Sequence, residues 1–311
     1  MSPSNTLLDS ALPPPAAPRP TTKTRPFYWS VRRELWENRS IYIAPLAAAG
    51  VVLVGLIIGA LHLPTKWAHM VSTLDPSRQS QIVAIPYAIA ATAIMATAFV
   101  VAIFYSLGAL QSERRDRSIL FWKSLPVSDL TTVMSKAVIP LVVLPAVSFA
   151  IMLVTLLFML AVTAVVLPMN GAPANLLLSA FPLGRTTVEL AYVLVVFTLW
   201  HAPIWGWLML VSGWARRATF LWAFGPPVVA CVFERLAFGT SYLPALLHYR
   251  LTGALTEAFT AGDASANMNH LDLAQMDPLK FMFTPGLWLG LLVAAILFAA
   301  AVWQRRYRAP I

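Results

Sequence analysis

The sequence predicts an all-α membrane protein with six transmembrane helices. Only 11% of its 311 residues are charged, whereas charged residues make up about 25% of a typical soluble domain. Apolar residues reach 59%, and the mean hydropathy is +0.71. The apolar residues also gather in runs of about 20, the length that crosses the ~30 Å hydrocarbon core of a bilayer as a helix. This composition excludes an ordinary soluble enzyme, a disordered protein and a fibrous repeat.

Six apolar runs are long enough to cross the membrane, and we expect residues 40–311 to form one membrane domain. The runs are 41–63, 82–110, 137–167, 188–214, 218–238 and 286–304. Prolines inside several of these runs should kink the helices, namely Pro45, Pro86, Pro140, Pro145, Pro203, Pro226 and Pro227. Residues 1–26 contain seven prolines and no apolar stretch, so they predict a disordered tail and not a signal peptide. The single cysteine, Cys231, excludes an intramolecular disulfide.

The basic residues predict the orientation, because cytoplasmic loops carry an excess of Lys and Arg. With a cytoplasmic N-terminus, 16 of the 22 basic residues fall on the cytoplasmic side and 6 on the outer side. Both termini are then cytoplasmic, and the longest connection, 239–285, lies outside, with short helices expected at 242–249 and 279–283. The net charge of +9 is explained by this bias, and no basic and aromatic motif points to nucleic acid as a partner.

Residues 27–39 predict an amphipathic helix that lies in the lipid headgroup region before the first span. Its apolar face and the flanks of that face consist of Phe27, Trp29, Val31, Leu35 and Trp36. Helical spacing places Arg33, Glu34 and Glu37 on the opposite, polar side. The helix is either a plain membrane anchor or a contact for a cytoplasmic partner.

The cytoplasmic loop at 111–136 contains an exposed apolar cluster behind a charged start. The cluster consists of Ile119, Leu120, Phe121, Trp122 and Leu125. Pro126 should end this short helix, and Ser128 is well placed to cap the next helix, which continues into the third span. A short loop cannot bury so much apolar surface by itself. The cluster therefore either dips into the lipid interface or docks into a groove of another protein.

This loop resembles the signature of ABC-2 type transporter permeases. In that family a Glu-led charged turn passes through Ser or Thr into a leucine-rich helix, and Leu-Pro-Val-Ser and a downstream Lys follow. The matching positions are Glu113, Ser118, Leu120, Leu125, Pro126, Val127, Ser128 and Lys136. Arg117 stands where many family members have Gly. The six spans, the helix before the first span and the large outer segment before the sixth extend the resemblance over nearly the whole chain.

The resemblance implies a permease subunit of an ABC exporter in the plasma membrane, which is the inner membrane if the source is a bacterium. It implies a second permease copy and two separate ATPase subunits that bind ATP and Mg²⁺, so that this chain binds no cofactor or metal. Residues 27–39 would be the connecting helix that touches the ATPase. The helix that couples to the ATPase would comprise Glu113, Arg117, Ser118, Ile119, Leu120, Phe121, Trp122 and Leu125. The chain has no G-x-x-x-x-G-K-[ST] phosphate loop, which agrees with ATP hydrolysis on another polypeptide.

Three ionisable side chains within the spans are candidates for a substrate pathway, because such groups are costly in the membrane. They are Glu189, Glu234 and His201. A structural interpretation stays open for each: the two carboxylates can pair with Arg185 and Arg235, and the histidine can be a hydrogen-bonded packing residue. Two other function classes depend on the same residues, an ion-coupled secondary transporter or channel and a membrane-embedded enzyme. The sequence does not identify the substrate.

Overall fold

The computed structural model describes residues 25–62, 75–115, 127–169, 182–259 and 276–307. These residues form helices and, apart from one isolated antiparallel bridge between Phe259 and Met276, no β-structure. The all-α prediction is confirmed for this part of the chain. Residues 1–24 of the predicted tail and residues 116–126 of the predicted apolar cluster lie outside it.

Five helical segments are long and apolar enough to cross a membrane, and there are six if one bent pair counts as a single span. The protein is therefore a multi-pass membrane protein. The segments are α2 (Ser40–His62), α4 (Pro76–Gly108), the continuous α7 (Asp129–Val138), η1 (Ile139–Val143) and α8 (Leu144–Met169), then α12 (Thr219–Phe238) and α15 (Pro285–Tyr307). The bent pair is α10 (Leu183–Trp200) and α11 (Ala202–Trp214).

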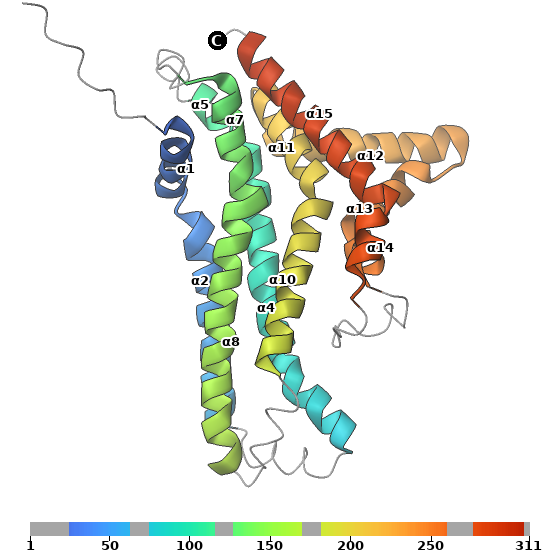
Figure 1. The fold of residues 1–311 in the computed structure, drawn as a ribbon. Helices are drawn as coiled ribbons and strands as arrows, with labels where there is room; N and C mark the ends of the chain where they lie inside the picture. Colours follow the sequence, from blue (N-terminus) through green and yellow to red (C-terminus); the bar gives the residue numbers. More distant parts are fainter. Residues whose placement is uncertain (1–24, 63–74, 116–126, 170–181, 260–275, 308–311) are drawn as a thin grey trace, which may run out of the picture.

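Four shorter helices complete the described fold: α1 (Pro26–Glu37), α5 (Gln111–Arg115), α13 (Tyr242–Ala258) and α14 (Pro278–Phe283). Figure 1 shows α1, α5, the start of α7 and the end of α15 at the same end of the bundle, which we call the upper end. The short helices predicted at 242–249 and 279–283 are present, and α13 continues well beyond the first of them.

Small side chains bring the long helices close together, as is usual where helices pack inside a membrane. In the lower half of the bundle, Ala49 of α2 and Ala90 of α4 lie in one buried cluster with Met152 and Leu156 of α8. At the upper end α11 packs against α15, where a Cβ on Gly206 would be 3.0 Å from the Cβ of Leu297. These two sets of contacts pack the long helices into one bundle.

Two spans are irregular within their length. The third span contains the π-helical turn η1, which includes Pro140. The fourth span, predicted over 188–214 with a kink at Pro203, is broken at His201 with a bend of 45°. Pro203 lies in the first turn of α11, and because it has no backbone N–H, the hydrogen-bond ladder of α10 cannot continue through it.

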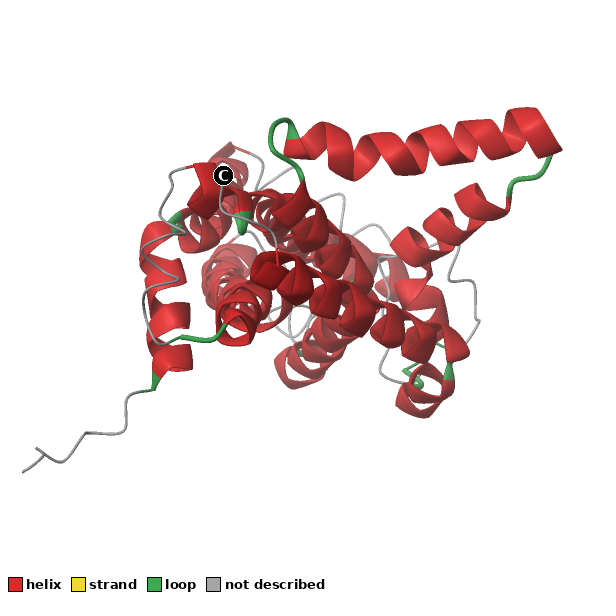
Figure 2. Ribbon diagram, turned by 90° about the horizontal axis from the view of Figure 1, so that it is seen from above, coloured by secondary structure: helices red, strands yellow, loops and turns green. Residues whose placement is uncertain are grey.

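The fifth apolar run forms a helix, but its direction differs from our expectation. We predicted that residues 218–238 cross the membrane as the fifth span, whereas α12 extends sideways across the axis of the bundle in both views (Figures 1 and 2). Its only buried residues are Ala223 and Glu234. Apolar length specifies a helix that avoids water, but it does not specify which neighbour the helix packs against.

Candidate functional site

Charged side chains from four helices meet inside the upper end of the bundle. Glu34 of α1 accepts a hydrogen bond from Lys136 Nζ of α7 at 2.7 Å. Glu113 of α5 lies 3.3 Å from the same Nζ through Oε1, and its Oε2 is 2.5 Å from Arg305 Nη1 of α15. Each of the four residues is at most 8% exposed. We call Glu34, Glu113, Lys136 and Arg305 the charge cluster.

Two more charges, one of each sign, lie at the edge of the charge cluster. Arg33 Nη2 lies 3.0 Å from Glu34 Oε1 and 3.4 Å from Glu113 Oε1. Asp129 Oδ1 accepts from Arg305 Nε at 3.1 Å. With these two residues the group contains three acidic and three basic side chains. Removing one partner of a buried pair leaves an uncompensated charge, so such a group holds its members together.

Neutral hydrogen bonds fix the Glu34 carboxylate in its place. Tyr105 of α4 donates to Oε2 at 2.9 Å, and Asn38 Nδ2 lies 3.4 Å from the same atom. Since Lys136 and Arg33 occupy Oε1, both carboxylate oxygens have partners. The end of α4 is thereby joined to α1 and α7.

A second set of hydrogen bonds attaches α5 to the end of α11. Ser212 Oγ accepts from the backbone N–H groups of Leu110 and Gln111, each at 3.0 Å. Arg114 donates to the Gly213 carbonyl. The start of the 111–136 loop is therefore fixed on one side by the charge cluster and on the other by α11.

The residues predicted to couple to a partner are only partly visible. Glu113 is described and buried, whereas Arg117, Ser118, Ile119, Leu120, Phe121, Trp122 and Leu125 lie outside the described residues. After them, Ser128 caps α7 as predicted, with its Oγ accepting from the Thr131 N–H at 3.1 Å. The helix then continues into the third span, as expected.

Helix α1 confirms the predicted helix at 27–39, but one assignment to its faces is wrong. Glu34 was placed on the polar side and is instead 1% exposed, because α7 brings Lys136 against it. Val31 and Leu35 pack against the core. Phe27, Trp29 and Trp36, from the predicted apolar face and its flanks, are exposed.

The exposed side of α1 carries a cation between two indole rings. The Arg32 guanidinium lies 5.2 Å from the ring centroids of both Trp29 and Trp36. Aromatic rings with an adjacent Arg are typical of the membrane interface, where the rings contact acyl chains and the cation contacts phosphates. The position of α1 in the membrane interface stays a prediction.

The two candidate carboxylates have structural partners. Glu189 lies 3.1 Å from Arg185 Nε, which is the charge pair considered from the sequence. Glu234 does not depend on Arg235 in the same way, because it accepts hydrogen bonds from Thr240 Oγ1 at 2.8 Å and from the backbone N–H groups of Tyr242 and Leu243 at 2.7 and 2.8 Å. Glu234 therefore caps the start of α13.

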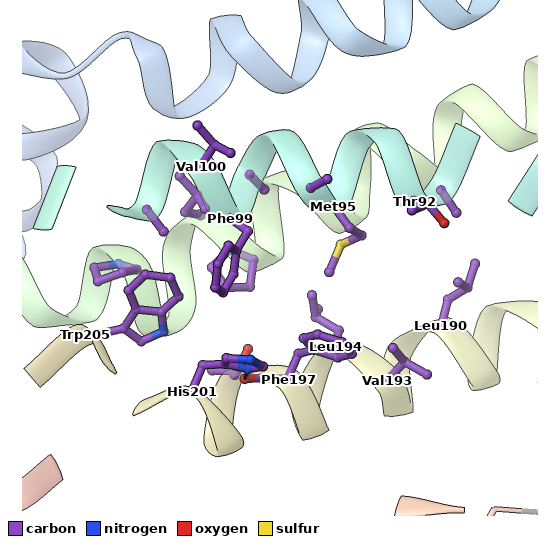
Figure 3. Close-up of a pocket in the computed structure, with 18 of the residues that line it drawn as sticks. Thr92, Met95, Phe99, Val100, Leu190, Val193, Leu194, Phe197, His201 and Trp205 are labelled. Carbon is purple, nitrogen blue, oxygen red and sulfur yellow. Dashed lines mark hydrogen bonds between the residues drawn. The ribbon is translucent and has the colours of Figure 1, made fainter. Parts of the chain in front are cut away.

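His201 has both a structural contact and a position beside a cavity. Its Nδ1 donates to the Phe197 carbonyl at 2.8 Å, and its ring stacks on Phe197 and meets Phe99 edge-on. The cavity has a volume of about 500 Å³ and lies between α4, η1, α8, α10 and α13 (Figure 3). The structure thus brings His201 to a pocket, while Glu189 and Glu234 are not among its lining residues.

Helix α13 is held against the bundle by Tyr249 and Arg250. The Arg250 guanidinium lies 4.7 Å from the Trp200 ring centroid, and its Nη1 donates to the Gly286 carbonyl at 3.1 Å. The Tyr249 ring meets Trp200 of α10 edge-on with the ring centroids 5.2 Å apart, and its hydroxyl donates to Glu257, also in α13, at 3.0 Å. Burial and this carboxylate raise the pKa of the Tyr249 phenol, which therefore stays protonated as the donor. Glycines at 286 and 290 leave room for both side chains.

Within the described ranges, no group of three or more His, Cys, Asp or Glu side chains could hold a metal ion. Comparison with known proteins gives no match, whether to family models, curated proteins or solved structures. The functional argument therefore depends on the geometry of the charge cluster and the pocket.

Sequence reasoning named Glu113 as a motif position and a coupling residue and Lys136 as a motif position, but it did not place either in a buried charge cluster, and it missed Tyr105 and Arg305. The one feature of the sequence that could have indicated the charge cluster is that its charged residues lie beside the upper ends of the apolar runs. We interpreted basic residues there as topology signals, and nothing in the one-dimensional pattern showed that acidic residues of distant segments neutralise them.

Proposed function

We propose that this chain is the membrane-spanning permease subunit of an ABC-2 type exporter, which couples to separate ATPase subunits. The observation that supports the proposal best is the burial of Glu113 in the charge cluster. This residue begins the loop whose apolar residues resemble a coupling helix, and it joins that loop to α1, α7 and α15. A displacement of the loop would move three helices together.

The third span offers a path from the charge cluster to the pocket. Lys136 lies in the charge cluster, and four residues later Pro140 lines the pocket, followed by Leu144 and Pro145. The intervening π-helical turn η1 departs from regular α-helix, as helices frequently do at functional sites. Movement at the upper end could thus change the shape of the pocket through one continuous helix.

The partners follow from this proposal. Two ATPase subunits bind ATP and Mg²⁺ on the cytoplasmic side, at the upper end of the bundle, and a second permease copy completes the transporter. The membrane is the plasma membrane. ATP binding acts by favouring one of two arrangements of the helices at the upper end.

The test is purification of the chain from its native membranes, followed by identification of a copurifying ATPase with a phosphate loop. Phe121→Asp and Trp122→Asp should abolish that association, because a carboxylate cannot enter an apolar groove without a large desolvation cost. Met169→Asp, at an exposed position in the last turn of α8, is the matched control and should retain the ATPase. Survival of the complex in both loop variants would contradict the proposal.

His201 favours one alternative, an ion-coupled transporter, because a titratable ring lies at the break of a span and beside a cavity. In that case transport would follow the proton gradient and not ATP, and His201→Gln would abolish it while the loop variants stayed active. The same purification and transport measurements therefore separate the two functions.

A further inference from the structure

The pocket has the composition of a site for uncharged molecules. Among the described residues that line it there is no Asp, Glu, Lys or Arg, and polar groups come only from Thr92, Thr198, His201 and the indole N–H of Trp205. A charged group placed there would have no counter-ion, which is unfavourable at membrane depth. A volume of about 500 Å³ falls within the range of small-molecule sites.

The two ends of the pocket differ in chemistry, as Figure 3 shows. One end is aromatic and consists of Phe99, Phe197, His201 and Trp205, with Phe99 in edge contact with both His201 and Trp205. The other end is aliphatic and contains Met95, Leu190, Val193 and Leu194. An elongated ligand would therefore place a ring or a hydrogen-bonding group beside His201 and a hydrocarbon chain along α4 and α10.

The walls of the pocket are irregular where they meet the aromatic end. Pro140 belongs to the π-helical turn η1, and His201 is the residue at which α10 and α11 break. Backbone that departs from regular helix at membrane depth is tolerated where it is buried in protein or lines a cavity. Two such departures at one cavity are a second, independent indication that the cavity binds a ligand.

We propose that this pocket binds an uncharged, elongated lipophilic molecule with one hydrogen-bonding group, of the class of long-chain alcohols. That this molecule is the transported substrate rests on the proposed transport function. Binding itself does not, because the pocket is formed within one chain and is tested without an ATPase.

The experiment uses the full chain in phospholipid nanodiscs and a decanol that carries a diazirine, a group that forms a covalent bond on illumination. Mass spectrometry should locate the label on the peptides that contain Met95 and Leu194, and excess unlabelled decanol should suppress it. Since the nanodisc phospholipid is in large excess, suppression by decanol also distinguishes a specific ligand from a lipid acyl chain.

Two substitutions on adjacent residues of α10 provide the decisive comparison. Leu194→Trp fills the pocket, and labelling of the pocket peptides should fall about tenfold, which corresponds to roughly 1.4 kcal/mol of binding free energy. Val195→Trp adds the same side chain on the half-exposed outer side of α10 and should leave the labelling unchanged. Ala96→Phe fills the pocket from α4 and should repeat the loss if Leu194→Trp does not fold.

Equal labelling in Leu194→Trp and Val195→Trp would overturn the proposal, and so would labelling that excess decanol does not suppress. Either result would leave the ATPase association untouched. Conversely, loss of the proposed coupling to an ATPase would not remove specific labelling of the pocket. The two proposals can therefore fail separately.

Discussion

Glu113 has two buried cationic partners, and this makes it a sensitive residue of the charge cluster. Its Oε1 lies 3.3 Å from Lys136 Nζ and its Oε2 lies 2.5 Å from Arg305 Nη1. Both cations are almost completely buried. Neutralising the Glu113 carboxylate would leave Lys136 and Arg305 with too little negative charge nearby, and because both are buried, water could not solvate them instead.

We expect Glu113→Gln to lower the free energy of unfolding by about 3–5 kcal/mol, the usual cost of removing one partner from a buried ion pair. Chemical denaturation of the purified protein in detergent measures this change. Glu37→Gln is the matched control, because Glu37 pairs with Arg33 at 3.4 Å in an exposed position, where such a pair contributes about 1 kcal/mol or less. Equal effects of the two substitutions would show that water solvates the charge cluster.

Glu34 shows why the charge cluster could not be predicted from the sequence. The helical periodicity of residues 27–39 correctly predicted a helix, and in an isolated helix Glu34 would belong to the polar side. Its burial depends on Lys136 and Tyr105, which are more than 70 positions away in the sequence. Periodicity describes the faces of one helix, whereas pairing between segments decides which polar residue can be buried.

At the scale of elements, α13 is held by side chains that enter gaps beside glycines of α15. A Cβ at Gly286 would lie 2.7 Å from the Tyr249 hydroxyl, and a Cβ at Gly290 would overlap the Arg250 guanidinium. Gly286 and Gly290 are four residues apart and form a small-residue motif of the kind that usually receives another helix. Here the motif receives one phenol and one guanidinium.

Gly290→Ala should therefore displace Arg250 and weaken the attachment of α13, at a cost of about 1–2 kcal/mol for the lost cation–π contact and hydrogen bond. Hydrogen exchange should increase in α13, and thermal unfolding in detergent should occur at lower temperature. Gly55→Ala is the matched control, because a Cβ there meets nothing within 4 Å. That change should stabilise α2 slightly, since Gly costs roughly 0.5–1 kcal/mol relative to Ala in a helix. Unchanged exchange in α13 would contradict the role of Arg250.

The positions of most helices followed from the sequence, but only some of their irregularities did. The predicted run 218–238 corresponds to Thr219–Phe238, and 286–304 lies within Pro285–Tyr307. Apolar length alone determines such boundaries. Prolines were a partial guide, because the fourth span breaks just before Pro203 and the π-helical turn η1 contains Pro140, whereas α2 and α4 contain Pro45 and Pro86 without a break. Neighbouring helices decide which proline interrupts a helix.

At the scale of the whole molecule, the charge bias predicts which ends face the cytoplasm. Replacing Cys231, the single cysteine of the chain, by Ser allows one new cysteine to be tested at a time. A membrane-impermeant maleimide should label Ser265→Cys in intact cells. It should label Arg216→Cys, in the short turn after α11, only after permeabilisation. Labelling of Arg216→Cys in intact cells would reverse the orientation and with it the proposed position of the ATPase.

The long-range arrangement was the least predictable feature of the fold. The sequence indicated correctly that the protein crosses the membrane several times, since 11% charge cannot cover a soluble surface. It did not indicate that α12 extends sideways (Figure 2), or that the third span connects a group of buried charges to a pocket. Both features depend on contacts between segments, which composition and periodicity do not encode.

The π-helical turn η1 allows the third span to become one residue shorter during evolution. A π-helical turn holds one residue more than regular α-helix needs between the same two ends. Deleting one residue between 139 and 143 would therefore restore ordinary geometry and keep every later side chain on its present side. The same deletion in the middle of α8 would rotate the remaining residues by about 100°. Within η1, the third span can thus lose one residue without turning its later side chains toward different neighbours.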